Sequence, residues 1–113
     1  MRPAAAAAAL PLKPLVYHVL VALAAGPRHG WSLVREIRQT TGGERLLPAN
    51  FYRTLRTMLA DGLIEETGEG DAGPEPRRRY FRLTKFGEAA GRAETHRLRA
   101  LLDKTPRVFL RKA

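Results

Sequence analysis

A helix that runs directly into a short apolar strand constrains the fold of this chain more than any other feature. Residues 51–60 place these apolar side chains on one helical face: Phe51, Leu55, Met58 and Leu59. A stop at Asp61 and Gly62 follows, and then the strand begins. Residues 77–84 supply a second strand, because apolar and polar side chains alternate there. The sequence therefore predicts a helix joined to a two-stranded ribbon.

Three further helices are predicted around this unit. The first covers residues 14–25, which lie between a first-turn proline and a Gly-Pro stop. The second covers residues 30–41, and the helix described above begins after Pro48. Thr84 is a suitable cap for a last helix that continues to about Lys104. Together these elements predict an α+β, mainly α fold: a winged helix-turn-helix of three helices and a two-stranded wing, with a C-terminal dimerisation helix.

The length of 113 residues is enough for one modest core. The chain divides into a flexible Ala/Pro-rich leader, a winged helix-turn-helix domain, a dimerisation helix and a tail, at residues 1–13, 14–84, 85–105 and 106–113. The leader resembles a weak signal peptide, but Pro11 and Lys13 interrupt its apolar run. Residues 15–25 are too few to span a bilayer. We expect a cytoplasmic protein with no membrane partner.

The charge of the chain favours a polyanionic partner. The net charge is +9, and the basic residues are mostly arginine, which binds phosphate and guanine in a bidentate manner. The alternatives are an anionic membrane surface, or an arginine content that reflects only a GC-rich genome. Cysteine is absent, which excludes disulfides and thiolate sites. The three histidines, His18, His29 and His96, are widely spaced, and no phosphate loop or catalytic motif is present. We therefore expect no enzyme activity, no cofactor and no metal.

The third predicted helix carries the candidate DNA-reading residues on the face opposite its apolar stripe. These are Asn50, Arg53, Thr57 and, on the flank, Arg56. Arginine suits guanine and asparagine suits adenine, although such a face can also be merely solvated. We expect Tyr52 to orient its hydroxyl against the DNA backbone, with packing at the core edge as the competing role.

Arginines at the base of the second strand are the candidate phosphate contacts, namely Arg77, Arg78 and Arg79. The Gly- and Pro-rich tip at residues 68–76 carries acidic residues that phosphate would repel. His29, just before the second helix, could contact DNA or a ligand. A histidine in that place more often satisfies a helix terminus.

The last helix is too long to be covered by a small core, so we expect it to form a dimer. Its approximately heptad-spaced line includes Phe86, Ala90, Ala93 and Leu101. We expect this line to face the partner's first helix through Val16, Leu20 or Leu23. The apolar residues 108–110 of the tail could dock or fray.

From Pro14 to about Lys104 the chain resembles the PadR family of bacterial transcriptional regulators. The similar segments include Tyr17 to Leu23, Gly26 to Trp31, Pro48 to Leu55, Asp61 to Ile64 and Arg78 to Gly87. The resemblance implies a homodimer joined through its first and last helices, which binds an inverted repeat and represses genes. The chain departs from the family at Leu47, where a polar cap is usual. Its single tryptophan, Trp31, lies in the second helix, whereas some relatives stack planar drugs between tryptophans across the dimer.

Two classes of function follow. The first is a sequence-specific repressor that binds double-stranded DNA as a homodimer, with or without a small-molecule effector of unknown identity. The second is a ligand-sensing or protein-interaction module that uses the winged helix as a scaffold, and fold alone does not decide between them. An interaction module would expose apolar side chains on the third helix, whereas a DNA reader would expose hydrogen-bonding ones.

Overall fold

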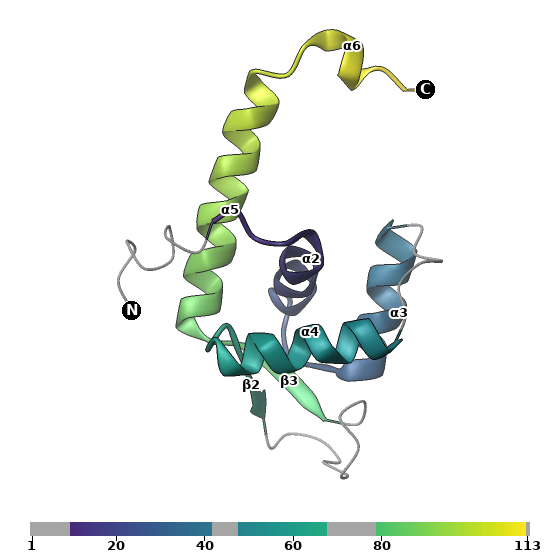
Figure 1. Ribbon diagram of the computed structural model, residues 1–113, viewed down its shortest axis with the longest axis vertical. Helices are drawn as coiled ribbons and strands as arrows, with labels where there is room; N and C mark the ends of the chain where they lie inside the picture. Colours follow the sequence, from purple (N-terminus) through teal and green to yellow (C-terminus); the bar gives the residue numbers. More distant parts are fainter. Residues whose placement is uncertain (1–9, 42–47, 68–78, 113) are drawn as a thin grey trace.

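The computed structural model describes residues 10–41, 48–67 and 79–112 and is mainly helical with a small antiparallel sheet (Figure 1). The elements in chain order are α2 Pro14–Leu23, β1 Arg28–His29, α3 Gly30–Thr41, α4 Pro48–Ala60, β2 Ile64–Thr67, β3 Tyr80–Leu83, α5 Lys85–Asp103 and α6 Arg107–Leu110. The predicted fold class and the four predicted helices are confirmed. The sequence missed β1 and the short α6.

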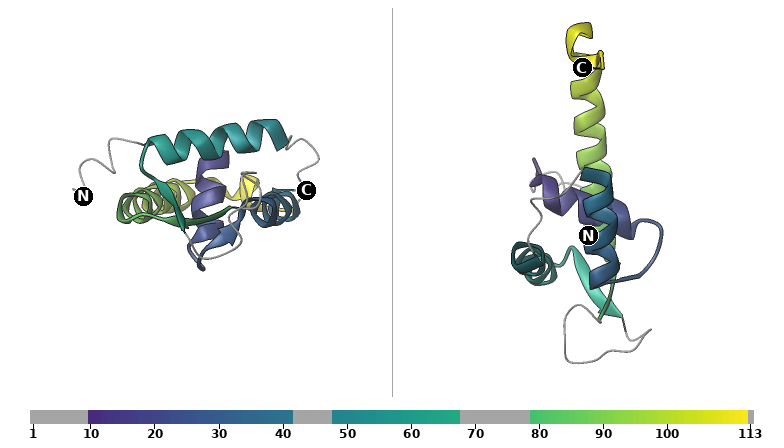
Figure 2. Two further views of the ribbon diagram at one scale, coloured as in Figure 1. Left: turned by 90° about the horizontal axis from the view of Figure 1, so that it is seen from below. Right: turned by 90° about the vertical axis from the view of Figure 1, so that its right-hand side faces the viewer.

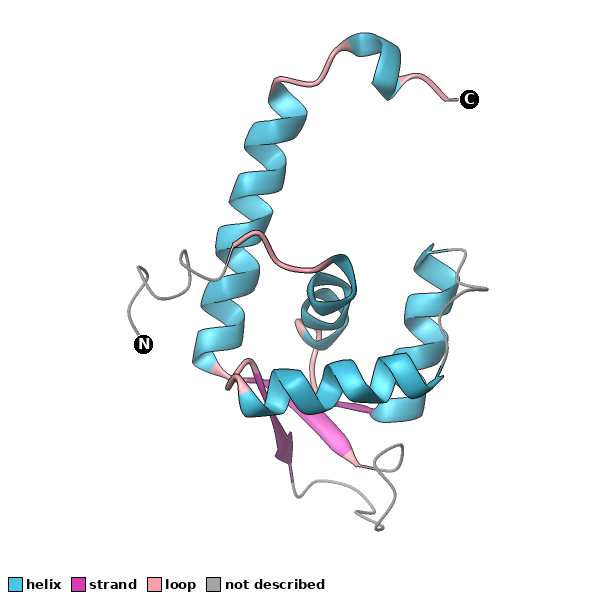
Figure 3. Ribbon diagram, viewed as in Figure 1, coloured by secondary structure: helices cyan, strands magenta, loops and turns pink. Residues whose placement is uncertain are grey.

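The sheet has the strand order β1-β3-β2 and lies at the opposite end of the molecule from α6 (Figure 3). Strands β2 and β3 pair antiparallel with Ile64 opposite Leu83 and Thr67 opposite Tyr80, as the predicted ribbon requires. Strand β1 adds to the other edge of β3, where His29 lies opposite Tyr80. Two residues are too few to show a period-two pattern, which is why the sequence did not reveal β1. The predicted wing tip at residues 68–76 lies outside the described residues.

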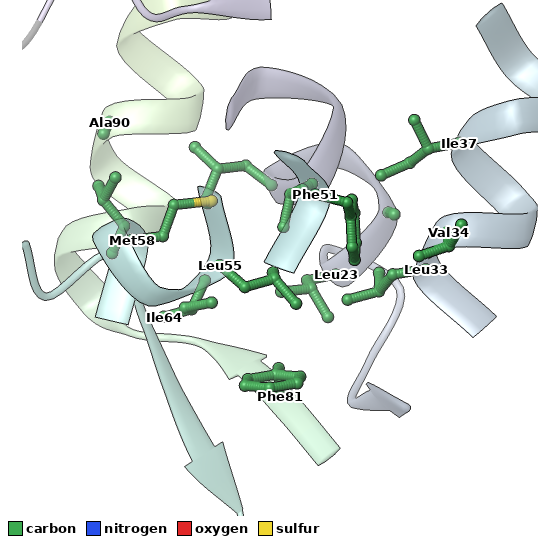
Figure 4. Packing of buried hydrophobic residues seen from close by; sticks show 14 residues of the cluster. Leu23, Leu33, Val34, Ile37, Phe51, Leu55, Met58, Ile64, Phe81 and Ala90 are labelled. Atoms are coloured by element: carbon green, nitrogen blue, oxygen red, sulfur yellow. The ribbon is translucent and has the colours of Figure 1, made fainter. Parts of the chain in front are cut away.

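The core forms where α4 lies over α2, α3 and the sheet (Figure 4). Phe51, Leu55 and Met58 on α4 are almost completely buried, as the helical spacing predicted, and Leu59 packs at the edge of the core. They meet apolar side chains from every other layer, including Leu23, Leu33, Ile64 and Phe81. The apolar face of α4 is therefore fixed toward the core, and this decides which of its residues face outward.

The start of α5 is fixed to the end of α4 by a small set of contacts. Thr84 caps α5 as predicted, since its hydroxyl oxygen accepts a hydrogen bond from Gly87 N–H at 3.0 Å. The same hydroxyl donates to the carbonyl oxygen of Gly62 at 2.5 Å. Gly62 has a φ of 77°, in the left-handed region that favours glycine. A Cβ at Gly87 would lie 1.9 Å from the Leu63 carbonyl oxygen, so only glycine permits this approach.

The second half of α5 extends beyond the body as an arm that ends in α6 (Figure 2, right). Its first half packs on α2 and the sheet, and Ala90 and Glu94 are buried there. Leu12 N–H donates to Glu94 Oε2 at 2.9 Å, and Leu12 packs against the core. Residues 10–13, which we assigned to a flexible leader, thus belong to the folded body, whereas residues 1–9 lie outside the described part. No helix in that part is long and apolar enough to cross a membrane.

The packing of α2 on α5 corrects part of the expected dimer interface. Leu20, Leu23 and Ala90 belong to the core of the single chain and are at most 2 % exposed, so these side chains are not available to a partner. The heptad-like line could not distinguish packing within the chain from packing between chains. The other expected interface residues differ in exposure: Val16 and Phe86 pack partly buried against the core, Ala93 is half-buried and Leu101 is 56 % exposed.

Candidate nucleic-acid interface

Helix α4 presents a polar face along one edge of the molecule, with its outer side open (Figure 2, left). Asn50, Arg53, Arg56 and Thr57 are exposed there, opposite the buried Phe51 and Met58. The structure thus brings these four sequence-predicted residues together on one surface. The width and polarity of such a helix suit a DNA major groove.

Internal hydrogen bonds define what two side chains on α4 can offer. Thr57 Oγ1 donates to the carbonyl oxygen of Arg53 at 3.1 Å, and Thr54 Oγ1 donates to that of Asn50 at 3.0 Å. A hydroxyl has one proton, so Thr57 in this rotamer can only accept from a partner. An amino group of adenine or cytosine would suit it. Arg53 and Asn50 keep their side-chain donors on the exposed face.

Tyr52 lies at the edge of the core. Its side chain is half-buried, packs against the hydrophobic cluster and meets the Phe51 ring edge-on, with centroids 5.4 Å apart and planes at 80°. The ring of Tyr52 thus lies at the core edge, and the expected contact of its hydroxyl to the DNA backbone stays a prediction.

Two ion pairs link the strands at the base of the wing. Arg79, just before β3, has its Nη1 2.8 Å from Glu66 Oε1 on β2. Arg82 Nε on β3 lies 2.8 Å from Glu65 Oε1 on β2. Both pairs are exposed, so each stabilises the sheet by only about 0–1 kcal/mol and can be exchanged for a phosphate. Arg79 is therefore a partly neutralised cation. Arg77 and Arg78 lie outside the described residues, and their role stays a prediction.

An aromatic and basic cluster that the sequence did not reveal lies where β1 meets α3. The ring of His29 packs edge-on against Tyr80, with centroids 3.8 Å apart, and stacks with Trp31 at 6.4 Å. The guanidinium of Arg35 lies 5.2 Å from the centre of the Trp31 ring, a cation–π distance. His29 thus belongs to β1 and to this cluster, and its expected role at the helix terminus stays a prediction. The Arg35–Trp31 spacing was the available signal, since residues four apart share a helical face.

Among the described residues, Glu94 is the one carboxylate that is almost completely buried, with 2 % of its side chain exposed. It accepts hydrogen bonds from Arg97 and from Leu12 N–H. The hydrogen bond from Arg97 lowers the pKa of Glu94 below its ordinary value of 4.5, against the opposing effect of burial. These contacts join the N-terminal segment to α5. Within the described ranges, no group of three His, Cys, Asp or Glu side chains is placed to hold a metal ion.

An apolar groove of about 290 Å³ lies between α2 and α5, away from the polar face of α4. We call it the α2–α5 groove. Its lining includes Tyr17, Leu20 and Val21 from α2 and Gly91, Thr95 and His96 from α5. At its edge the Tyr17 and Thr95 hydroxyls lie 2.6 Å apart.

A three-stranded sheet and a helix whose inner face is buried and whose outer face is polar together define a winged helix-turn-helix protein. Residues 19–93 match the model of the PadR-like family of transcriptional regulators, and the chain belongs to that family. Among curated proteins no sequence matches the chain.

Several solved structures share the fold. RosR of H. salinarum is 24 % identical, with a TM-score of 0.64 over 85 % of this chain and 79 % of that one. A transcriptional regulator of Clostridium thermocellum is 20 % identical, with a TM-score of 0.62 over 79 % and 84 % of the two chains. The adhesin competence repressor of Streptococcus pyogenes is 16 % identical, with a TM-score of 0.62 over 91 % and 69 %. At such identities the likeness shows the fold alone.

Proposed function

We propose that this PadR-like regulator binds double-stranded DNA sequence-specifically as a homodimer and represses transcription from an inverted-repeat operator. The polar face of α4 carries the proposal. None of the exposed large hydrophobic side chains among the described residues belongs to α4. A face of Asn50, Arg53, Arg56 and Thr57 therefore offers hydrogen bonds and positive charge, as a major groove requires.

The proposed contacts divide by chemistry. Arg53 suits the O6 and N7 acceptors of a guanine, and Asn50 suits the N6 and N7 of an adenine. Arg56 on the flank suits a phosphate or a base edge. At the wing, Arg77 and Arg78 would bind phosphates directly, and Arg79 would do so by releasing Glu66. The net charge of +9 supports a nucleic-acid partner as a whole.

The proposed dimer rests on the arm of α5. Glu94 lies about one turn after Ala90, and Leu101 lies about three turns after Ala90, so all three residues lie on one side of the helix. The chain's own core covers this side at Ala90 and Glu94, whereas Leu101 is 56 % exposed. A second copy that covers the arm would continue the same interface. A two-fold pair would place the recognition helices about 34–36 Å apart, one turn of duplex.

Selection of binding sites from random duplexes with the purified protein tests this function. We expect enriched sites to contain two half-sites in inverted orientation. Recovery of the input sequences without enrichment would contradict sequence-specific binding, and enrichment of a single half-site would contradict the dimer.

The alternative function is a ligand-sensing or protein-interaction module on the winged-helix scaffold. The α2–α5 groove is the observation that favours it, because its apolar lining could hold a small effector. The two functions are compatible, since the groove and the polar face of α4 lie apart. A protein that bound ligands but enriched no duplex would be such a module only.

A further inference from the structure

The short helix α6 exposes three consecutive large apolar side chains. Val108, Phe109 and Leu110 are 61 %, 77 % and 58 % exposed, and Phe109 is the most exposed large apolar residue that the structure describes. We call these three residues the α6 cluster. Single exposed apolar side chains are common on proteins, but a contiguous group of this size marks a contact site.

Cations surround the α6 cluster along the chain. Four of them flank it, namely Lys104, Arg107, Arg111 and Lys112. All four are exposed, and none forms an ion pair with another residue that the structure describes. Asp103 is the only acidic residue of the sequence after Glu94. The C-terminal end therefore combines an apolar centre with an excess of unpaired positive charge.

The arm of α5 holds the α6 cluster away from the rest of the chain. From the buried Glu94 to Asp103 at its end, α5 rises by roughly 14 Å, at about 1.5 Å per residue. Figure 1 shows α6 at one end of the molecule, with α4 and the sheet toward the other end. A partner that covers the α6 cluster therefore leaves the polar face of α4 free.

An anionic lipid surface suits this combination of side chains. A nucleic acid would pair with the cations but would leave the aliphatic Val108 and Leu110 in water. A wholly apolar partner would desolvate the cations beside the cluster without pairing them. At a membrane interface, apolar side chains enter the acyl boundary while lysine and arginine stay among the anionic headgroups. The four residues of α6 are too few to span a bilayer, so such a contact is peripheral.

We propose that the α6 cluster and its four flanking cations bind an anionic phospholipid surface. This goes beyond the proposed DNA binding and does not depend on it. It replaces the expectation from the sequence that no membrane is a partner. A single apolar anchor gives only marginal membrane binding, so the apolar cluster and the cations act together as two signals. Each cation near such a surface contributes about 5-fold in affinity.

Flotation of the full chain with lipid vesicles tests the proposal. We expect binding to vesicles of mixed phosphatidylglycerol and phosphatidylcholine, and little binding to phosphatidylcholine alone. Phe109→Asp should lower the affinity by roughly 10-fold or more. Val21→Asp is the matched control, because Val21 is also exposed, at 55 %, but lies on α2. Equal losses in the two variants, or no binding by the parent, would overturn the proposal. Unfolding midpoints equal to that of the parent would show that both variants fold.

Two double variants that remove the same charge separate the α6 end from α4. The double change Arg107→Ala and Arg111→Ala should lower vesicle affinity by about 25-fold and leave duplex binding unchanged. The double change Arg53→Ala and Arg56→Ala should do the opposite. If the α4 variant loses vesicle binding as strongly as the α6 variant, the polar face of α4 binds the lipid and the proposal fails. If the α6 variant loses only duplex affinity, its cations contact nucleic acid and the proposal fails.

Fluorescence of Phe109→Trp reports insertion directly. Its emission should shift to the blue when anionic vesicles are added. The parent gives the baseline, because its single tryptophan, Trp31, lies at the start of α3 and should not shift. Emission that is already blue-shifted without vesicles and unchanged with them, together with a monomeric Phe109→Asp in sedimentation, would assign the cluster to a second copy and overturn the proposal. A parent that binds vesicles through α6 but selects no operator would remove the proposed function and leave this inference standing.

Discussion

Arg53 is the residue on which sequence reading by α4 should depend most. Its guanidinium lies on the exposed face, and its backbone carbonyl is held by Thr57. Replacement by alanine should cost about 1–3 kcal/mol of operator binding and relax the preference at one operator position. The measurement is site selection with Arg53→Ala beside the parent.

Arg99→Ala is the matched control, since Arg99 is also an exposed arginine but lies on the arm of α5. It should preserve the preference at every position. Identical binding preferences for Arg53→Ala and the parent would mean that α4 does not read the operator.

The lowered pKa of Glu94 predicts how the stability of the fold should depend on pH. Because the pKa of its carboxyl is lowered in the folded state, the ionised form stabilises the protein above the ordinary value of 4.5. This contribution is lost as the pH falls through the folded-state pKa. Urea unfolding should show a lower midpoint for Glu94→Gln than for the parent at pH 7. The difference should close as the pH is brought well below 4.5, and a constant difference would contradict the assigned role.

At the scale of elements, the junction between α4 and α5 permits a sharp test with two glycines of one helix. A Cβ at Gly87 would lie 1.9 Å from the Leu63 carbonyl oxygen, so Gly87→Ala must displace backbone and should destabilise by about 1–3 kcal/mol. A Cβ at Gly91 would lie 3.8 Å from Leu20, an ordinary contact. Gly91→Ala should therefore be neutral or stabilise by up to about 1 kcal/mol through helix propensity. Urea titration of both variants decides, and equal unfolding midpoints would contradict the close approach.

The wing should contribute charge without sequence preference. Each change to alanine at Arg77, Arg78 or Arg79 should reduce the slope of log affinity against log salt by about 1 and weaken all sequences alike. Because Glu66 pairs with Arg79, Glu66→Ala should release that arginine and strengthen binding to any sequence. Titration at several salt concentrations measures both effects. An unchanged slope in the triple variant would remove the wing from DNA binding.

At the scale of the whole molecule, Ala93 tests the dimer. It is half-buried on α5, next to the buried Glu94, and it belongs to the dimer interface that the sequence predicts. A carboxylate buried there without a partner should cost on the order of 3 kcal/mol of dimer stability. Sedimentation of Ala93→Glu should show a shift toward monomer. The control is Arg99→Glu, because Arg99 follows Ala90 by two and a half turns and therefore lies on the side of α5 opposite the proposed interface. A parent that is itself a monomer at micromolar concentration would contradict the dimer directly.

The sequence predicted much of this architecture because its signals were local. Proline and glycine stops set the helix limits, and helical spacing identified the buried face of α4 with its polar reverse. The remainder depends on tertiary contacts that no local pattern encodes. Strand β1 exists through its pairing with β3, and the burial of Leu20 and Ala90 depends on α2 crossing α5 in the same chain. The pairing of Arg79 with Glu66 likewise depends on strand register.

The junction at Thr84 has a consequence for regulation. Thr84 and Gly87 hold the start of α5 against Gly62 and Leu63, directly after α4, so a rotation of α5 would carry α4 with it. In the proposed homodimer, joined along the two α5 helices, a small rotation at the interface would change the distance between the two α4 helices. The spacing of the two α4 helices would then set the operator affinity, without any effector touching DNA. The stiffness of this corner would determine how faithfully the rotation is transmitted.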